Sequence, residues 1–418
     1  MNMRILIAVA ALFSAVASFS QTTEEYILSH PVCARAQFTG YPVPTEALSP
    51  SPDGYKPVYL SHYGRHGSRY TSNMSPHKTA LSMLGAADEK GMLTPLGKSV
   101  FIRVKSMAAD AEGRDAGLTV VGEQEHRGIA ERMYLNYPEI FAGSVRVECR
   151  SSEVPRSILS MAANNERLRE LNPAISLSRS AYLGYGRILR NKTYRDEQVD
   201  EINRLKREYF KGLEPDRMIA SIFLPEECRL MDMKSREKFM KAMYYLWQNT
   251  DCTAHTGVSF DEVFTPEELF VLWKAYNSGN YIKCGNSEEH GEGTLNDARP
   301  LVRDFVERAD AALSGNGVSA DLRFGHDTML APFLALVNVN GIGATAPRSE
   351  EAYKVWADFK VMPMAANIQM VFYKDSRSHT LVKILHNERE CRLPDVKTDR
   401  FPYYEWADVR EYLLSLAD

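Results

Sequence analysis

Residues 58–70 read Val-Tyr-Leu-Ser-His-Tyr-Gly-Arg-His-Gly-Ser-Arg-Tyr, and no other segment of the chain indicates more about its function. The alternation of Val58 and Leu60 with their neighbours predicts a β-strand over 57–63. Gly64 and Gly67 then free the backbone, so the turn that follows the strand can approach a ligand closely. The stretch therefore places one imidazole between two permanent cations, directly after a strand.

Arg65, His66 and Arg69 together have the chemistry of an anion site. Guanidinium groups hold phosphate oxygens in two-point fashion and stay charged at any working pH. An imidazole with the usual pKa of about 6.5 is mostly neutral near pH 7, so it can attack a held phosphorus atom and form a phosphohistidine. The alternative is a histidine between two surface arginines, because so short a motif also arises by chance.

Two later segments supply the other groups that phosphoryl transfer needs. An alternating strand over 144–150 leads through a small polar turn to Arg156, at the start of an expected helix. A strand over 320–325 delivers His326 and Asp327 at its carboxyl end. Ligands of open α/β sheets bind beyond the carboxyl ends of strands, so the three segments should converge. Cations, imidazoles and an acid are the groups that neutralise a phosphate and protonate a leaving alkoxide.

The chain resembles the histidine acid phosphatases, which include phytases and multiple inositol polyphosphate phosphatases. The match is carried, in the family's order, by RHGSR at 65–69, RSSEVPRS at 150–157 and HDT at 326–328. LTVVGEQEHRGIAERMY at 118–134 and HNERE at 386–390 are also similar to the family's pattern. The resemblance extends from about residue 40 to the end of the chain.

The resemblance implies a role for each matching residue. His66 would be phosphorylated and Asp327 would protonate the leaving oxygen, while the phosphate would be bound by Arg65, Arg69, Arg156 and His326. This chemistry needs no metal and no cofactor, and neither a Cys-x-x-Cys pair nor a His-Glu-x-x-His motif is present in the sequence.

The resemblance leaves the substrate open. SHYGRHGSRY at 61–70 is similar to the inositol polyphosphate branch, which usually carries His-Ala-Glu where this chain has HDT at 326–328. HDT instead fits bacterial phytases and sugar phosphatases. Inositol polyphosphates such as phytate are the favoured substrates, and the alternative is a broad acid phosphatase or a glucose-1-phosphatase-like sugar phosphatase. A secreted phosphate-binding protein without turnover is a rival of another class, and transfer of a phosphoryl group between metabolites fits poorly with secretion.

The pattern of elements predicts an α/β fold with a mainly parallel sheet, helices on both faces and an inserted α-helical cap. The expected strands are 57–63, 144–150, 320–325, 367–374 and 380–386. The catalytic domain is expected to comprise 21–180 and 298–418, with the helix-rich cap at 181–297. Within the cap, the composition of 278–293 predicts an exposed loop.

Arg187, Arg190 and Lys192 form a dense basic cluster near the expected entrance to the cap. They could bind further phosphates of the substrate, or they could simply face solvent, as charge runs usually do. His62 could touch the site or lie in the core, His126 is explained by the face of a helix, and Glu388 could orient a phosphate-binding arginine.

The amino terminus predicts export. Arg4 precedes an apolar run over 5–16 and small residues up to Ser20, which together predict a secretory signal peptide over 1–20. No later apolar stretch is long enough to span a bilayer. Six cysteines in an oxidising compartment allow up to three disulfides, with 15 possible pairings. A net charge of −4 over 418 residues does not suit a nucleic-acid partner. We expect a secreted or periplasmic monomer that acts on a small phosphorylated molecule.

Overall fold

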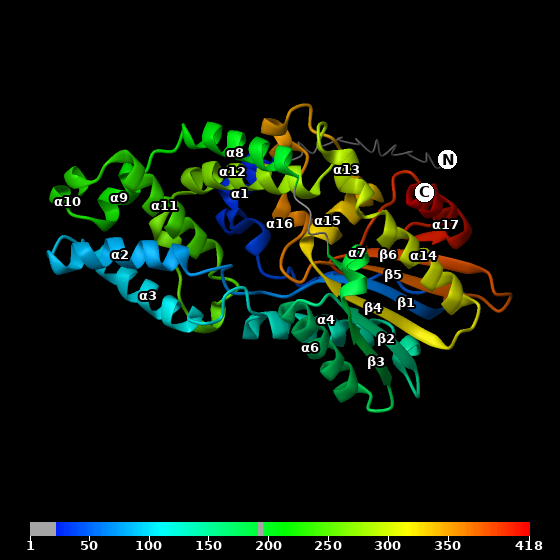
Figure 1. Cartoon of the computed structure of the whole chain (residues 1–418). Helices are drawn as coiled ribbons and strands as arrows, with labels where there is room; N and C mark the ends of the chain where they lie inside the picture. Colours follow the sequence, from blue (N-terminus) through cyan, green and yellow to red (C-terminus); the bar gives the residue numbers. More distant parts are fainter. Residues whose placement is uncertain (1–21, 191–194) are drawn as a thin grey trace, which may run out of the picture.

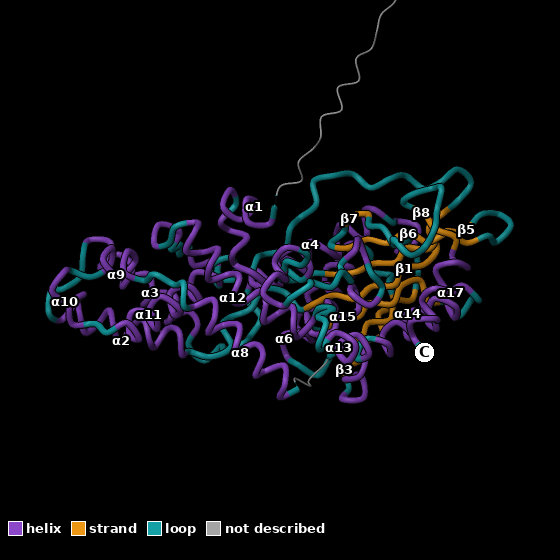
Figure 2. Tube along the Cα trace, turned by 90° about the horizontal axis from the view of Figure 1, so that it is seen from above, coloured by secondary structure: helices purple, strands orange, loops and turns teal. Residues whose placement is uncertain are grey.

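A β-sheet forms one end of the molecule and a lobe of helices alone forms the other, as Figures 1 and 2 show from two directions. The structure is a computed structural model that describes residues 22–190 and 195–418. The expected signal peptide and Lys192 therefore lie outside the described residues. No helix within the described ranges is long and apolar enough to cross a membrane.

The sheet is mixed. Its strands are β1 (Lys56–Arg65), β2 (Arg146–Ser151), β3 (Ser176–Ala181), β4 (Val318–Gly325), β5 (Asn367–Lys374), β6 (Thr380–His386), β7 (Arg389–Glu390) and β8 (Tyr403–Glu405). They follow the order β3-β2-β4-β1-β5-β6-β7, and β8 pairs with β6. The strands β3, β2, β4 and β1 are parallel, whereas every pair from β1–β5 onward is antiparallel. The expected α/β class is confirmed, and its parallel half is the half that carries the sequence motifs.

Helices cover both faces of the sheet and alternate side chains of β1 enter different cores. Tyr59 and Tyr63 pack with α14, α15 and α17, while Leu60 packs with α4, α5 and α6. The covering helices are α14 (Arg299–Leu313), α15 (Asp327–Leu336) and α17 (Trp406–Ala417) on one face, and α4 (Val120–Asn136), α5 (Pro138–Phe141) and α6 (Pro155–Leu171) on the other. Burial on both faces explains the apolar strand sequences.

The helical lobe draws on more of the chain than the expected cap at 181–297. It contains α2 (Ser75–Glu89), α3 (Pro95–Ala111), α8 (Asp196–Phe210), α9 (Asp216–Ile222), α10 (Pro225–Leu230), α11 (Met233–Gln248) and α12 (Pro266–Cys284) (Figure 1). α2 and α3 share one core with α9, α11 and α12. Shorter helices complete the chain: α1 (Thr23–Ser29), α7 (Gly186–Leu189), α13 (Gly291–Asn296) and α16 (Asp358–Val361).

The expectation of an exposed loop over 278–293 was wrong for its first half. Residues 278–284 are the last two turns of α12, and most of them are buried. The polar residues that suggested a loop have internal partners. Asn277 donates to the carbonyl of Trp356 at 3.1 Å, and Asn280 donates to the carboxylate of Asp358 at 2.8 Å. A helix with buried and paired amide side chains can have the same composition as an exposed loop, so composition alone does not distinguish the two.

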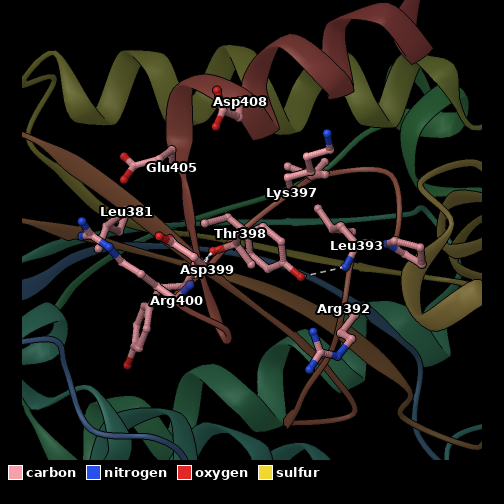
Figure 3. Close-up of a pocket in the computed structure, with 13 residues that line it drawn as sticks. Leu381, Arg392, Leu393, Lys397, Thr398, Asp399, Arg400, Glu405 and Asp408 are labelled. Atoms are coloured by element: carbon pink, nitrogen blue, oxygen red, sulfur yellow. Dashed lines mark hydrogen bonds between the residues drawn. The ribbon is translucent and has the colours of Figure 1, made fainter.

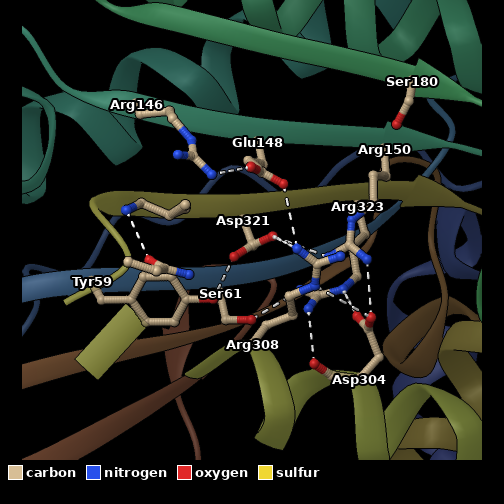
Figure 4. Close-up of polar contacts among 12 residues, drawn as sticks. Tyr59, Ser61, Arg146, Glu148, Arg150, Ser180, Asp304, Arg308, Asp321 and Arg323 are labelled. Atoms are coloured by element: carbon tan, nitrogen blue, oxygen red, sulfur yellow. Dashed lines mark hydrogen bonds and ion pairs between the residues drawn. The ribbon is translucent and has the colours of Figure 1, made fainter. Parts of the chain in front are cut away.

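A network of buried ion pairs fixes the parallel strands relative to α14 (Figure 4). Asp304 of α14 contacts Arg150 of β2 at 2.9 Å and Arg323 of β4 at 2.6 Å. Arg150 also contacts Asp321 at 3.0 Å, and Arg323 donates to the hydroxyl of Ser61 on β1 at 2.9 Å. Because β1, β2 and β4 all lead into the sequence motifs, this network sets the relative positions of the motif-bearing strand ends.

All six cysteines lie within the described residues, and each is a free thiol in the structure. Four of them, Cys149, Cys252, Cys284 and Cys391, are buried. The pairing that an oxidising compartment would allow is therefore not seen among these positions.

Candidate active site

A pocket of about 320 Å³ lies where β1 and β4 end and the turn after β2 meets α12. Its lining includes five of the residues singled out from the motifs, and it also receives residues from the helical lobe. The lining residues are Gln37, His66, Arg69, Arg156, Arg190, Asn280, Lys283, Cys284, His326, Asp327, Thr328 and Met362. The three motif segments, which are separated by up to 260 residues in the sequence, therefore meet at one site, as the strand-end argument predicted.

His66 is held with one ring nitrogen directed at the protein and the other left for the pocket. Its Nδ1 lies 2.9 Å from the carbonyl oxygen of Gly67, and a carbonyl only accepts, so Nδ1 carries the proton. Nε2 is then the nitrogen with the free electron pair. Burial, together with the charges of Arg156 and Arg65, holds the pKa of His66 well below its usual value. The imidazole is therefore neutral and nucleophilic even in acid.

Arg65 lies beneath the pocket and is completely buried. Its Nη1 donates to the carbonyl oxygens of Gln37 and Met362 at 2.7 and 2.6 Å, and its Nη2 lies 2.8 Å from Oδ2 of Asp327. Burial lowers the pKa of Arg65, although the group stays charged at any working pH. Arg65 thus links the segments beneath the pocket to the carboxylate of Asp327.

The positive charges of Arg69 and Arg156 repel one another across the pocket. Arg69 lies over the ring of Phe38, with 5.0 Å from the guanidinium carbon to the ring centre, and donates to the carbonyl of Tyr70. Burial and the charge of Arg69 lower the pKa of Arg156 to about 10. The Nε atoms of Arg65, Arg69 and Arg156 are all buried and find no acceptor among the described residues. Buried donors of this kind favour an anion in the pocket.

His326 and Asp327 occupy the junction between β4 and α15. His326 is the residue immediately before α15, and its Nε2 lies 3.0 Å from the hydroxyl of Ser152. Its ring packs edge-on against that of His66, with 5.4 Å between centroids. Burial and the charge of Arg156 lower the pKa of His326 to about 3. The second imidazole is therefore neutral as well.

Asp327 is ionised. Burial alone would raise the pKa of its carboxyl, but the charges of Arg65 and Arg69 hold that pKa below its usual value. Asp327 begins α15, and Arg156 lies in the first turn of α6. Helix N-termini attract anions because their first backbone N–H groups are unpaired within the helix. Two helices thus add positive potential to the pocket.

The basic cluster predicted near the cap is divided by the structure. Arg190 lines the pocket and donates to Glu153 at 3.1 Å, whereas Arg187 is exposed and is not part of the lining. Arg187 lies on α7, which packs against α14 and β4 rather than within the helical lobe. Lys192 is outside the described residues. Glu388 binds Arg132 at 2.6 Å and not a phosphate-binding arginine, so its expected orienting role was wrong.

Sequence reasoning missed the wall that α12 contributes. Asn280 and Lys283 are three residues apart and therefore share a face of the helix that lines the pocket. The spacing alone was visible in the sequence, but the expected loop over 278–293 concealed it. Gln37 reaches the pocket from a 3-10 helix (Pro31–Phe38) and Met362 from the residue after α16, and no sequence signal identified them.

A larger cavity of about 640 Å³ lies between β6, β8 and α17 (Figure 3). Its cations and carboxylates are interspersed, with Arg392, Lys397 and Arg400 near Asp399, Glu405 and Asp408. Its lining contains neither a histidine nor a cysteine, and so it lacks the imidazoles found in the smaller pocket. Among the described residues, no group of three or more His, Cys, Asp or Glu side chains is arranged to hold a metal ion.

Comparisons with known proteins identify the fold. No protein-family model and no curated protein sequence matches the chain. Among solved structures, the multiple inositol polyphosphate phosphatase of Bifidobacterium longum in complex with phosphate is 19% identical, with a TM-score of 0.74 over 91% of this chain and 97% of that one. The phytase of D. castellii is 13% identical, with a TM-score of 0.66 over 97% of this chain and 89% of that one. The phytase of Citrobacter braakii is 12% identical, with a TM-score of 0.54 over 86% and 98%. The chain thus has the fold of these proteins, in agreement with the α/β class predicted from the pattern of elements.

Proposed function

We propose that the protein is a histidine acid phosphatase that hydrolyses phosphomonoesters, with inositol polyphosphates such as phytate as substrates. The observation that carries the proposal is the convergence of three arginines, two neutral imidazoles and one acid on a single pocket. Its strongest detail is the tautomer of His66, because the bond from Nδ1 to Gly67 leaves Nε2 as a nucleophile. The shared fold with an inositol polyphosphate phosphatase and phytases supports the same activity.

In the first step, Nε2 of His66 attacks the phosphorus atom and the bond to the ester oxygen breaks. Arg65, Arg69, Arg156 and His326 bind the phosphoryl oxygens and stabilise the charge that they carry in the transition state. The leaving alkoxide takes a proton from Asp327. The products of this step are a phosphohistidine and the free alcohol.

Asp327 must be protonated for this step, although its lowered pKa keeps it ionised before the substrate binds. A bound phosphate places negative charge beside the carboxylate and competes for Arg65, and both effects raise the pKa of Asp327. Acidic pH favours the same state. In the second step, the carboxylate of Asp327 takes a proton from water as the water oxygen attacks the phosphohistidine, which releases inorganic phosphate and restores His66.

The substrate class follows from the charge of the pocket beyond the phosphate site. Arg190 and Lys283 add cations to the lining, and a substrate with several phosphates could engage them together with the catalytic arginines. The alternative substrate class is that of broad acid phosphatases or glucose-1-phosphatase-like sugar phosphatases. Asp327 within HDT is the observation that favours it, since the resemblance links this motif to sugar phosphatases as well as to bacterial phytases.

The test measures phosphate release from phytate and from glucose 1-phosphate at several acidic pH values with EDTA present, for the wild type and for His66→Ala. Release from phytate that is lost in the variant supports the proposed substrate and nucleophile. Release from glucose 1-phosphate alone keeps the mechanism and selects the alternative substrate class. Acid-quenched samples of the wild type should retain phosphate on the protein, and His66→Ala should retain none.

Absence of release from either ester would favour a phosphate-binding protein. Titration with inorganic phosphate would then show binding by the wild type without turnover.

We also propose that the protein is exported through the signal peptide expected at 1–20. We further propose that it is organised as an α/β domain and a helical domain.

A further inference from the structure

We call residues 65–69 the catalytic loop. Almost all of its polar backbone groups form hydrogen bonds to other elements of the fold. The amides of Arg65 and His66 donate to the carbonyls of Ala366 and Gly325 at 2.8 and 2.9 Å. The carbonyl of Ser68 accepts from both the backbone and the hydroxyl of Thr119 at 2.9 and 3.0 Å. A loop that carries a nucleophile and its phosphate ligands gains from such restraint, because misplacement of about 1 Å costs about 100-fold in rate.

Two adjacent side chains of α4 contact the catalytic loop on either side of the nucleophile. His126 is fully buried, and its Nε2 lies 3.1 Å from the carbonyl oxygen of Arg65, the residue before His66. Since a carbonyl only accepts, Nε2 carries a proton. Nδ1 has no partner among the described residues, and burial lowers the pKa of His126 to about 4, which agrees with a neutral ring.

Glu125 holds the other end of the catalytic loop. Its carboxylate accepts from the amide and the hydroxyl of Ser68 at 2.7 and 2.8 Å, and from the amide of Tyr41 at 3.1 Å. Ser68 precedes Arg69, so this carboxylate fixes the backbone from which one phosphate-binding arginine extends. The helix is locked against the loop, because a Cβ on Gly67 would approach the carbonyl oxygen of Gly122 to 2.5 Å.

We propose that Glu125 and His126 are positioning residues that fix the catalytic loop for phosphoryl transfer, His126 by aiming the His66 ring and Glu125 by placing Arg69. The proposal rests on the proposed phosphatase function. Neither side chain lines the pocket, so neither touches the substrate. The helix-face explanation from the sequence accounts for the burial of His126 but not for its bond to the catalytic loop.

The two residues should therefore affect different kinetic quantities. Loss of the His126 bond disturbs the aim of the nucleophile, so His126→Leu should lower kcat by about 10–100-fold with little change in KM. Glu125→Gln should raise KM and weaken binding of inorganic phosphate. In either orientation, the amide nitrogen of glutamine would face a backbone N–H, of Ser68 or of Tyr41, and Arg69 would lose its fixed backbone.

The experiment compares kcat, KM and thermal unfolding of the full chain for wild type, His126→Leu, His126→Gln and Glu125→Gln on a substrate that the wild type hydrolyses. Glutamine can place an N–H donor near the position of Nε2, so His126→Gln should recover kcat to within about threefold of wild type. His77→Leu is the matched control. His77 is also fully buried and neither ring nitrogen has a partner among the described residues, so this variant should leave kcat unchanged.

Equal kcat for His126→Leu and His126→Gln, whether both are high or both are low, would overturn the role of His126. If His126→Leu does not fold, His126→Asn replaces it, since the shorter amide cannot reach the carbonyl of Arg65, and equal kcat for the Gln and Asn variants again overturns the role. An unchanged KM and phosphate affinity in Glu125→Gln would overturn the role of Glu125. Lack of turnover by the wild type would instead reject the proposed function.

Discussion

At the scale of single residues, the site keeps two imidazoles neutral and one carboxylate charged until a substrate arrives. Burial among arginines lowers the pKa of both His66 and His326, so neither charges at mildly acidic pH. The charge of Arg65 keeps Asp327 ionised in the same pocket. The proposed mechanism needs a nucleophile that resists protonation and an acid that gains its proton on binding, and these pKa shifts allow both at the same acidic pH.

Asp327→Asn separates the acid from the binding groups, because asparagine keeps the shape of the side chain but has no proton to give. We expect kcat for phytate or another alkyl phosphate to fall by about 10²–10⁴-fold, the range for a lost general acid. Hydrolysis of 4-nitrophenyl phosphate, whose leaving group needs no proton, should change far less. Steady-state kinetics on both substrates tests this, and an equal fall on both would exclude Asp327 as the leaving-group acid.

Arg190→Glu tests whether the predicted basic cluster binds further phosphates. Arg190 lines the pocket, so the reversal should raise KM for phytate by at least about tenfold and KM for a monophosphate much less. Arg187→Glu is the matched control, since it makes the same charge change at an exposed position outside the lining. Similar increases for the two substrates in Arg190→Glu would mean that this arginine does not recognise additional phosphates.

At the scale of elements, Asp304 of α14 joins the strands that carry the site (Figure 4). Burial alone would raise the pKa of Asp304, but Arg323 and Arg150 hold it at about 2, against 3.8 for a free side chain. A depressed pKa adds stability above pH 3.8, and this stability is lost as the pH falls toward 2. This lowering of the pKa corresponds to about 2–3 kcal/mol of folding free energy.

Asp304→Asn should therefore lower the free energy of unfolding by about 2–3 kcal/mol at pH 6, and the difference from wild type should narrow as the pH approaches 2. Denaturant unfolding over this range measures it. Asp310→Asn on the same helix is the control, because Asp310 pairs with Arg410 at the surface, where such pairs contribute about 0–1 kcal/mol. A constant difference at all pH values would show that the ionised carboxylate is not the stabilising species.

The same elements show what the sequence could and could not predict. Five expected strands, from 57–63 to 380–386, correspond to β1, β2, β4, β5 and β6, because buried strands have a clear apolar pattern. β3 was missed, since Ser176–Ala181 is an edge strand with mostly polar, partly exposed side chains. The sequence motifs predicted the arginines and histidines of the pocket, whereas Asn280 and Lys283 reach the pocket only through the packing of α12. Such long-range packing leaves no local pattern.

At the scale of the whole molecule, the pocket lies between the α/β part and the helical lobe. His66, Arg156 and His326 come from the sheet side, and Asn280 and Lys283 come from α12. A ligand that contacts both sides binds only the folded arrangement and stabilises it by mass action, by about 2.7 kcal/mol at a concentration of 100 Kd. We therefore expect a large ligand, but not a small one, to contact the helical lobe when it binds.

Lys283→Met in a His66→Ala background tests this division, since the background prevents turnover. Phytate should raise the unfolding temperature less in the double variant than in His66→Ala, because the methionine keeps the bulk of the side chain but not its charge. Inorganic phosphate is small enough to bind at the arginines of the sheet side alone, so its stabilising effect should be equal in the two proteins. If phytate stabilises both proteins equally, the α12 wall does not bind substrate phosphates and recognition is confined to the motif residues. If both ligands lose their effect, Lys283 instead supports the phosphate site itself.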